Sequence, residues 1–122
     1  MSIPVEIAEL EERIAEYGEQ AFLVTVTEEG TPHVVSAVVR VEAGRLVMGA
    51  GRRTRANLER HPTATLLWSP GPAGAYSLIV DGLHDAGATD DESLAVEVTS
   101  AVLHSVAGAA GEGPNCVPVG SS

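Results

Sequence analysis

Apolar residues change their spacing along the chain, and these changes predict the order of its elements. Over residues 4–17 they recur at helical intervals with glutamates between them, which predicts an N-terminal helix. Pro4 suits the first turn of that helix and Gly18 suits its end. From Ala21 the spacing becomes two, the period of a β-strand. Five strands are expected on this pattern, over residues 21–27, 33–41, 45–50, 63–69 and 76–84.

The segments between these strands predict how they are joined. Residues 28–32 and 42–44 have turn compositions, so the first three strands should form an antiparallel meander. A short helix over residues 54–60, with Thr54 as its cap, should follow the third strand. Residues 94–106 fit a helix or a strand, and their β-branched side chains favour a sixth strand. The expected fold is therefore mainly β, a closed or nearly closed six-stranded antiparallel barrel with an N-terminal helix and one short helix after strand 3.

The second strand carries apolar residues on both of its faces. Val35, Ala37 and Val39 point one way, while Val34 and Val38 point the other way. The interior of a barrel can cover one of these faces, and the other needs a separate cover. A second copy of the chain is the simplest cover, so we expect a homodimer.

Length and composition restrict the class of protein. The 122 residues suit one domain, expected over residues 1–107, and the Gly-, Ala-, Pro- and Ser-rich residues 108–122 should form a flexible tail. Apolar runs stop well short of the roughly 20 residues that cross a bilayer, and no signal-peptide pattern opens the chain. The single Cys116 excludes an internal disulfide framework, and the histidines lack metal-ligand spacing. We expect a cytoplasmic protein with no membrane partner and no bound metal.

The charge of the chain is acidic overall but locally basic. The net charge of −10 argues against general nucleic-acid binding, which needs a basic surface. All seven basic residues are arginines, however, and six of them lie within residues 40–60. This segment either attracts an anionic ligand or pairs with surface carboxylates.

Residues 49–58 combine three features that favour an anionic ligand. Their glycines end the third strand and let a ligand approach the backbone closely. The helix that follows offers free N–H groups and a favourable dipole. Arg52, Arg53 and Arg55 supply planar, multidentate donors for phosphate. The segment thus predicts a phosphate site, although it lacks the lysine of a Walker loop and the glycine spacing of a dinucleotide fingerprint.

The order of these motifs resembles a known superfamily. A strand is followed by a Glu-Gly-Thr-Pro-His hairpin (29–33), a strand ending at Arg40, a Gly-Arg-Arg-Thr-Arg-Ala-Asn-Leu helix (51–58) and a strand led by His-Pro (61–62). This order is similar to that of the FMN-binding split barrels, which include pyridoxamine 5′-phosphate oxidase-like proteins and flavin/deazaflavin oxidoreductases. The resemblance covers residues 19–103. It implies a split β-barrel homodimer that binds FMN, or the deazaflavin F420, at the subunit interface.

The resemblance also implies a set of cofactor-binding residues. In this superfamily the turn between strand 3 and the helix holds the phosphate, and the second strand runs along the flavin ring. Trp68 is a further candidate for stacking on the ring, although packing in the core or a dimer is the simpler role for a tryptophan. The chain lacks a lysine near this helix, so arginine must substitute for it, and it lacks the longer helical insertion and C-terminal segment of enzymes that oxidise vitamin B6. The expected cofactor-binding residues are Val35, Ser36, Ala37, Val38, Arg52, Arg53, Thr54, Arg55, Asn57 and Trp68.

The sequence identifies no catalytic residue, which suits a flavin enzyme because the cofactor carries the chemistry. The expected function is a flavin-type oxidoreductase that performs two-electron redox on a small organic molecule, with FMN as the first choice of cofactor and F420 as the second. Two alternatives stay open on the same residues. One is a barrel that binds or stores flavin or haem without turnover. The other is a cofactor-free interaction module.

Overall fold

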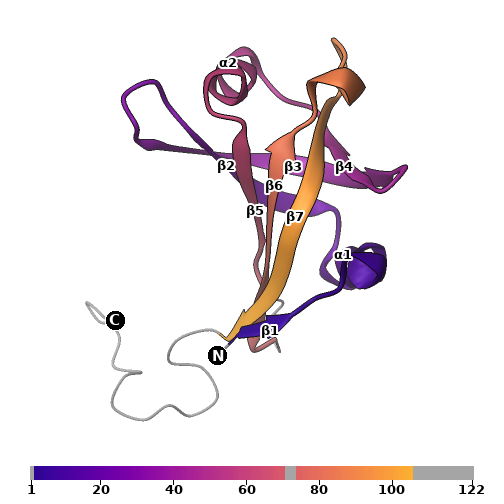
Figure 1. The fold of residues 1–122 in the computed structure, drawn as a ribbon. Coiled ribbons are helices and arrows are strands. Elements are labelled where there is room, and N and C mark those ends of the chain that lie inside the picture. The colour runs from indigo at the N-terminus through magenta and orange to yellow at the C-terminus, as the bar shows by residue number, and fades with distance from the viewer. Residues whose placement is uncertain (1, 71–73, 106–122) are drawn as a thin grey trace, which may run out of the picture.

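The computed structural model describes residues 2–70 and 74–105, which form a small β-barrel with two α-helices (Figure 1). Two short 3-10 turns, Ile7–Glu9 and Ala86–Ala88, precede α1 and β7. The helices and strands are β1 (Ser2–Pro4), α1 (Leu10–Tyr17), β2 (Gln20–Val26), β3 (Pro32–Glu42), β4 (Arg45–Met48), α2 (Arg52–Arg60), β5 (Thr63–Trp68), β6 (Tyr76–His84) and β7 (Leu94–Ser105).

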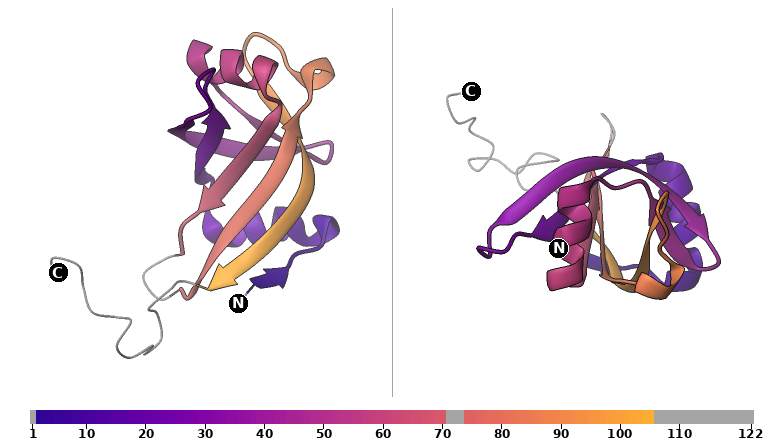
Figure 2. Two further views of the ribbon diagram at one scale, coloured as in Figure 1. Left: turned by 60° about the vertical axis from the view of Figure 1, so that its left-hand side comes forward. Right: turned by 90° about the horizontal axis from the view of Figure 1, so that it is seen from above.

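Six of the strands close the barrel. They follow the order β7-β4-β3-β2-β5-β6, every neighbouring pair is antiparallel, and β6 returns to β7. One edge of β7 has two partners, because residues 94–97 pair with β4 and residues 102–104 pair with β1. The view from above in Figure 2 shows the strands surrounding a common interior. Closure leaves the six barrel strands without a long open edge.

The alternation of side chains along each strand builds the core. On β3, Ala37 and Val39 are buried inside the barrel, while Val34 and Val38 lie exposed on its outer surface. The spacing predicted these two faces, and the structure decides which of them lies inside. The deepest side chains of the core come from all six strands and from α2; they are Leu23, Val39, Leu46, Met48, Leu58, Leu66, Trp68, Leu78, Val80, Leu94 and Val96.

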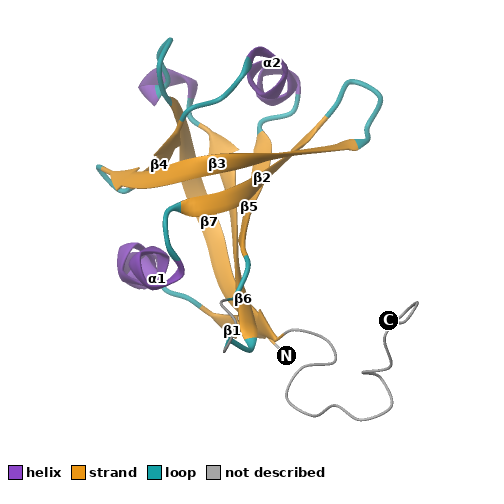
Figure 3. Cartoon of the chain, turned by 180° about the vertical axis from the view of Figure 1, so that it is seen from behind, coloured by secondary structure: helices purple, strands orange, loops and turns teal. Residues whose placement is uncertain are grey.

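The two helices lie toward opposite ends of the barrel (Figure 3). At the α1 end, Leu10 and Ile14 enter the core, and the Trp68 indole Nε1 donates a 2.9 Å hydrogen bond to the carbonyl oxygen of Gly18. Gly18 ends α1 with a φ of 99°, a conformation that favours glycine. At the other end, α2 follows the turn after β4. This second end carries the segment with the predicted phosphate site.

The fold expected from the sequence is confirmed, including the strand assignment of residues 94–105. Three boundaries were wrong. The N-terminal helix begins at Leu10 rather than at Pro4, because residues 2–4 pair with β7 as an additional strand. The third predicted strand, β4, ends at Met48. The helix after it begins at Arg52, with Gly51 as its N-cap, so Thr54 is the third residue of the helix and does not cap it.

The pairing of β6 with β7 contains a bulge between Asp81 and Gly82. Gly82 lies so close to β7 that a Cβ atom added there would stand 2.5 Å from the carbonyl oxygen of Glu97 and 2.5 Å from Val96 Cγ1. A bulge bends a strand and increases its twist. The position therefore requires glycine for the close approach of the two strands.

Candidate functional site

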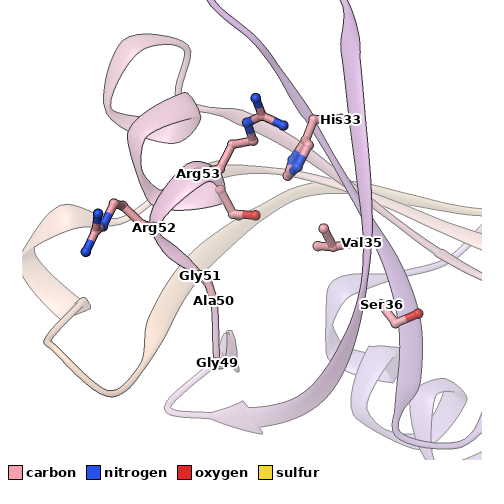
Figure 4. Close-up of a pocket in the computed structure, with 9 residues that line it drawn as sticks. His33, Val35, Ser36, Gly49, Ala50, Gly51, Arg52 and Arg53 are labelled. Carbon is pink, nitrogen blue, oxygen red and sulfur yellow. The ribbon is translucent and has the colours of Figure 1, made fainter.

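A cavity of about 410 Å³ lies where β3 faces the turn between β4 and α2 (Figure 4). The strand ends at this turn because glycine and alanine are poor strand formers, and α2 starts directly after Gly51. One wall of the cavity is therefore formed by β3, and the other is formed by the turn and the first residues of α2. The residues that line it are His33, Val35, Ser36, Gly49, Ala50, Gly51, Arg52, Arg53 and Thr54.

The turn presents open backbone to the solvent. A Cβ atom added at Gly49 or Gly51 would meet nothing within 4 Å, so space for a ligand is present in front of both residues. The first intrahelical bond runs from the Arg55 N–H to the Gly51 carbonyl oxygen at 3.1 Å. The N–H groups of residues 52–54 precede it and lie at the positive end of the helix dipole. This end of α2 has the donors and the polarity that an anion requires.

Arg52 and Arg53 add exposed positive charge beside these N–H groups. Within the part of the chain that the structure describes, neither arginine makes an ion pair. Figure 4 shows the Arg53 guanidinium on the side of the cavity where His33 lies, while the Arg52 side chain extends away from it. By contrast, Arg13 pairs with Glu16, Arg40 with Glu42 and Arg45 with Asp85, so surface pairing explains those three arginines and not Arg52 or Arg53 in the described structure.

Arg55 was also expected to bind phosphate, but its guanidinium is already occupied by backbone carbonyls. It donates from Nε to Ala50 O at 3.1 Å, and from its two terminal nitrogens to Asp90 O at 2.8 Å and Asp91 O at 3.4 Å. It therefore fixes the turn before α2 to the loop before β7. Hydrogen bonds from the backbone N–H groups of Glu92 and Ser93 lower the pKa of Asp90, with a smaller contribution from the charge of Arg55.

Thr54 and Asn57 are buried, unlike the two arginines before them. The Asn57 side-chain amide donates a 3.1 Å hydrogen bond to the Thr25 hydroxyl, and Thr25 is 1% exposed. This buried hydrogen bond of Asn57 therefore holds α2 against β2. Thr54 lies on the wall of the cavity but offers very little of its surface to it.

The four residues predicted along the flavin ring all lie on β3, but their side chains point to different faces of the strand. Figure 4 shows Val35 pointing into the cavity, whereas the Ser36 hydroxyl points away from it. Ala37 is buried in the barrel, and Val38 is exposed on the outer surface. Trp68 lies in the core and is not part of the cavity wall. The structure brings Val35, Ser36, Arg52, Arg53 and Thr54 together and places Ala37, Val38, Arg55, Asn57 and Trp68 elsewhere.

His33 is the lining residue that the sequence did not single out. It is half-buried on β3, and its Nδ1 atom is buried without a hydrogen-bond partner in the described structure. Its position was readable in one respect, since it has the same strand parity as Val35 and follows the predicted hairpin. Only the tertiary structure shows that the turn before α2 faces the side of β3 that carries His33 and Val35.

A second cavity of about 470 Å³ lies on the other side of Arg52 and Arg53, between α2 and the β2–β3 hairpin. Its wall includes Glu28 and Glu29 as well as Arg60. The two carboxylates oppose an anion there, so the glycine-lined cavity is the better candidate for a phosphate site.

Over residues 2–70 and 74–105, no three His, Cys, Asp or Glu side chains are placed to hold a metal ion. None of the helices described is long and apolar enough to span a bilayer. Cys116 and the predicted tail of residues 108–122 lie outside the described residues.

No protein-family model matches the chain. Two proteins resemble it in sequence, the uncharacterized protein Mb0449c of Mycobacterium bovis (strain ATCC BAA-935 / AF2122/97) and the uncharacterized protein MT0457 of Mycobacterium tuberculosis (strain CDC 1551 / Oshkosh). Each is 38% identical over 98 residues, and the match covers 69% of this chain and 69% of the relative. The chain belongs to the family of these two mycobacterial proteins.

Solved structures share the fold at low sequence identity. An FMN-binding protein from Syntrophomonas wolfei subsp. wolfei has a TM-score of 0.64 at 10% identity, over 82% of this chain and 86% of that one. An F420 reductase has a TM-score of 0.61 at 17% identity, over 74% and 94%. A heme binding protein from Mycobacterium smegmatis has a TM-score of 0.56 at 16% identity, over 83% and 52%. The chain shares its fold with these proteins, and this confirms the split barrel that the sequence motifs predicted.

Proposed function

We propose that this protein binds a phosphorylated flavin-type cofactor in the cavity at the start of α2, with FMN as the first choice and F420 as the second. The observation that carries the proposal is the cavity wall itself. Open glycine backbone, the first N–H groups of a helix and Arg53, which makes no ion pair within the described residues, meet there in a split-barrel fold. The cavity volume also lies within the range of about 300–1,000 Å³ that is usual for small-molecule sites.

The residues present fit such a group in a defined way. A phosphate would accept hydrogen bonds from the N–H groups of residues 52–54 and from the guanidinium of Arg53, with Arg52 adding charge nearby. Val35 would give the apolar end of the cofactor a surface on β3. When bound, a flavin supplies two-electron redox chemistry, and the protein then has to hold it, orient it and exclude water. A small organic molecule is the proposed substrate.

A homodimer is part of the same proposal. Phe22, Val34 and Val38 form an apolar patch on the outer surface of β2 and β3, and their side chains are 44%, 56% and 56% exposed. Ser36 lies in this patch opposite Phe22 and also lines the cavity, so a partner seated on the patch would border the cofactor site. Cover by a second copy would remove the patch from water.

The dimer is tested with a charged substitution in the patch. Val38→Asp is expected to shift the protein from dimer to monomer in analytical ultracentrifugation at micromolar concentration. Ile7→Asp, at a residue that is 53% exposed but lies outside the patch, is the matched control and should leave the mass unchanged. A wild-type protein that sediments as a monomer would refute this part of the proposal.

Cofactor binding is tested by titrating the protein with FMN and with riboflavin, which lacks the phosphate. FMN is expected to bind at least about tenfold more tightly, because a charged hydrogen bond contributes about 1.5–3 kcal/mol. F420 and haem are then titrated separately by their visible spectra. A protein that binds neither FMN nor F420, or that prefers haem to both, would overturn the proposal.

Turnover is tested on the loaded protein. Reduction of the bound cofactor by a nicotinamide donor and its reoxidation by an organic acceptor would support an oxidoreductase. Tight binding with neither reaction would instead support a carrier that stores the cofactor.

A further inference from the structure

His33 occupies the strand side of the cavity, across from the start of α2. It pairs with Thr25 in the β2–β3 register, so its side chain follows the same inward parity as Val35. Figure 4 shows the imidazole extending from β3 and the Arg53 guanidinium extending from α2, from facing walls toward the same end of the cavity. A ligand that enters between the two elements would meet both side chains.

The fold makes no use of His33 as a polar group. Its Nδ1 is the one buried side-chain nitrogen or oxygen without a hydrogen-bond partner in the described residues. The other strand histidines are engaged, since His84 Nε2 lies 3.2 Å from the Thr89 hydroxyl and His104 Nδ1 lies 2.8 Å from the Ser2 hydroxyl.

An unpaired buried nitrogen costs stability, because the polar atom loses its hydrogen bonds to water and gains none in return. An apolar side chain of similar size at this position would avoid that cost. The packing of the barrel gives no reason for an imidazole here, and a group bound in the cavity would supply one.

We infer that His33 is a phosphate-binding residue, which acts with Arg53 to hold the anionic group of the ligand from the side opposite α2. The inference rests on the proposed function. Rotation of the ring about the Cβ–Cγ bond exchanges Nδ1 with the ring carbon on its other edge, so a bound phosphate can accept a hydrogen bond from the nitrogen that the barrel leaves unpaired. Side chains of β3 and α2 then enclose the phosphate.

The inference predicts opposite effects on binding and on stability. His33→Leu should lower the affinity for FMN by about fivefold or more, while leaving the affinity for riboflavin unchanged. The same variant should melt at the same temperature as wild type or higher, because it removes an unpaired polar atom. His33→Gln, which restores a donor, should recover much of the FMN affinity. His61→Leu, at an exposed histidine that ends α2, is the matched control.

The outcomes separate this inference from the proposed function. If wild type prefers FMN to riboflavin and His33→Leu keeps that preference, the role of His33 is refuted and the cofactor site stands. If His33→Leu weakens FMN and riboflavin equally, His33 does not act on the phosphate and the inference also fails.

A wild type that binds no flavin would refute the proposed function, and inorganic phosphate then tests His33 alone. The probe is the set of imidazole resonances of the four histidines in a phosphate titration monitored by NMR. A saturable shift of the His33 signals that is absent in Arg53→Ala would support the inference. Unchanged His33 signals would overturn it.

Discussion

Arg53 and Arg55 stand two residues apart in the same helix, and the structure predicts that their removal has different consequences. Arg53 is exposed beside the cavity and makes no ion pair in the described residues. Arg55 donates hydrogen bonds to three backbone carbonyls. Arg53→Ala should therefore act on ligand binding, and Arg55→Ala should act mainly on the free energy of unfolding.

The magnitudes follow from the hydrogen bonds involved. A hydrogen bond from a charged donor contributes about 1.5–3 kcal/mol. For Arg53→Ala, the loss of one such bond to phosphate predicts a decrease in FMN affinity of about ten- to hundredfold, with little change in stability. For Arg55→Ala, the contacts with Ala50 and Asp90 are the shortest, and their loss predicts a decrease in the free energy of unfolding of about 1.5–3 kcal/mol.

Both quantities are measured on each variant, the first by fluorescence titration with FMN and riboflavin and the second by urea denaturation. Arg60→Ala is the control, because it removes the same charge from the other end of α2. If Arg60→Ala lowers the FMN affinity as much as Arg53→Ala does, the effect comes from the total positive charge of α2 and not from a contact of Arg53 with the phosphate. The reasoning is refuted if Arg53→Ala leaves FMN affinity unchanged in a folded protein, or if Arg55→Ala causes the larger loss of FMN affinity at equal stability.

Three further predictions concern stability. Gly82→Ala should lower the free energy of unfolding by about 1–3 kcal/mol, because the added Cβ meets the backbone of β7 at 2.5 Å; an unchanged urea midpoint would contradict this. Asn57→Ala should cost about 1–3 kcal/mol, because it leaves the buried hydroxyl of Thr25 without its donor, and adding Thr25→Val should then cost less than the two single changes together. The hydrogen bond from Arg45 lowers the pKa of Asp85 below its usual 3.8, so the stabilisation is present above that pH and is lost as the pH falls through the lowered pKa. Asp85→Asn should make the melting temperature depend less on pH over this acidic range. A variant whose melting temperature falls with pH as steeply as that of wild type would contradict the assignment.

The sequence determined most of the fold. Period-two alternation placed five strands, because a strand with one face in a core must alternate. The β-branched content of residues 94–106 decided the sixth, which the structure shows as β7. It also placed the glycine turn and the arginines of α2 next to each other, since neighbours along the chain stay neighbours in space. The start of the N-terminal helix was missed, because strand pairing of residues 2–4 with β7 depends on a partner about 100 residues away.

Only the tertiary structure decided what each candidate side chain does. Arg53 and Arg55 look equivalent in sequence, but the loop before β7 supplies carbonyl acceptors to Arg55 and none to Arg53. His33 could not be distinguished from the other histidines until the structure placed the start of β3 and the turn before α2 on the same cavity. Strand periodicity fixes the face on which a side chain lies, whereas its role depends on the groups that the tertiary structure places across from it, such as the Asp90 and Asp91 carbonyls that Arg55 reaches 35 and 36 residues along the chain.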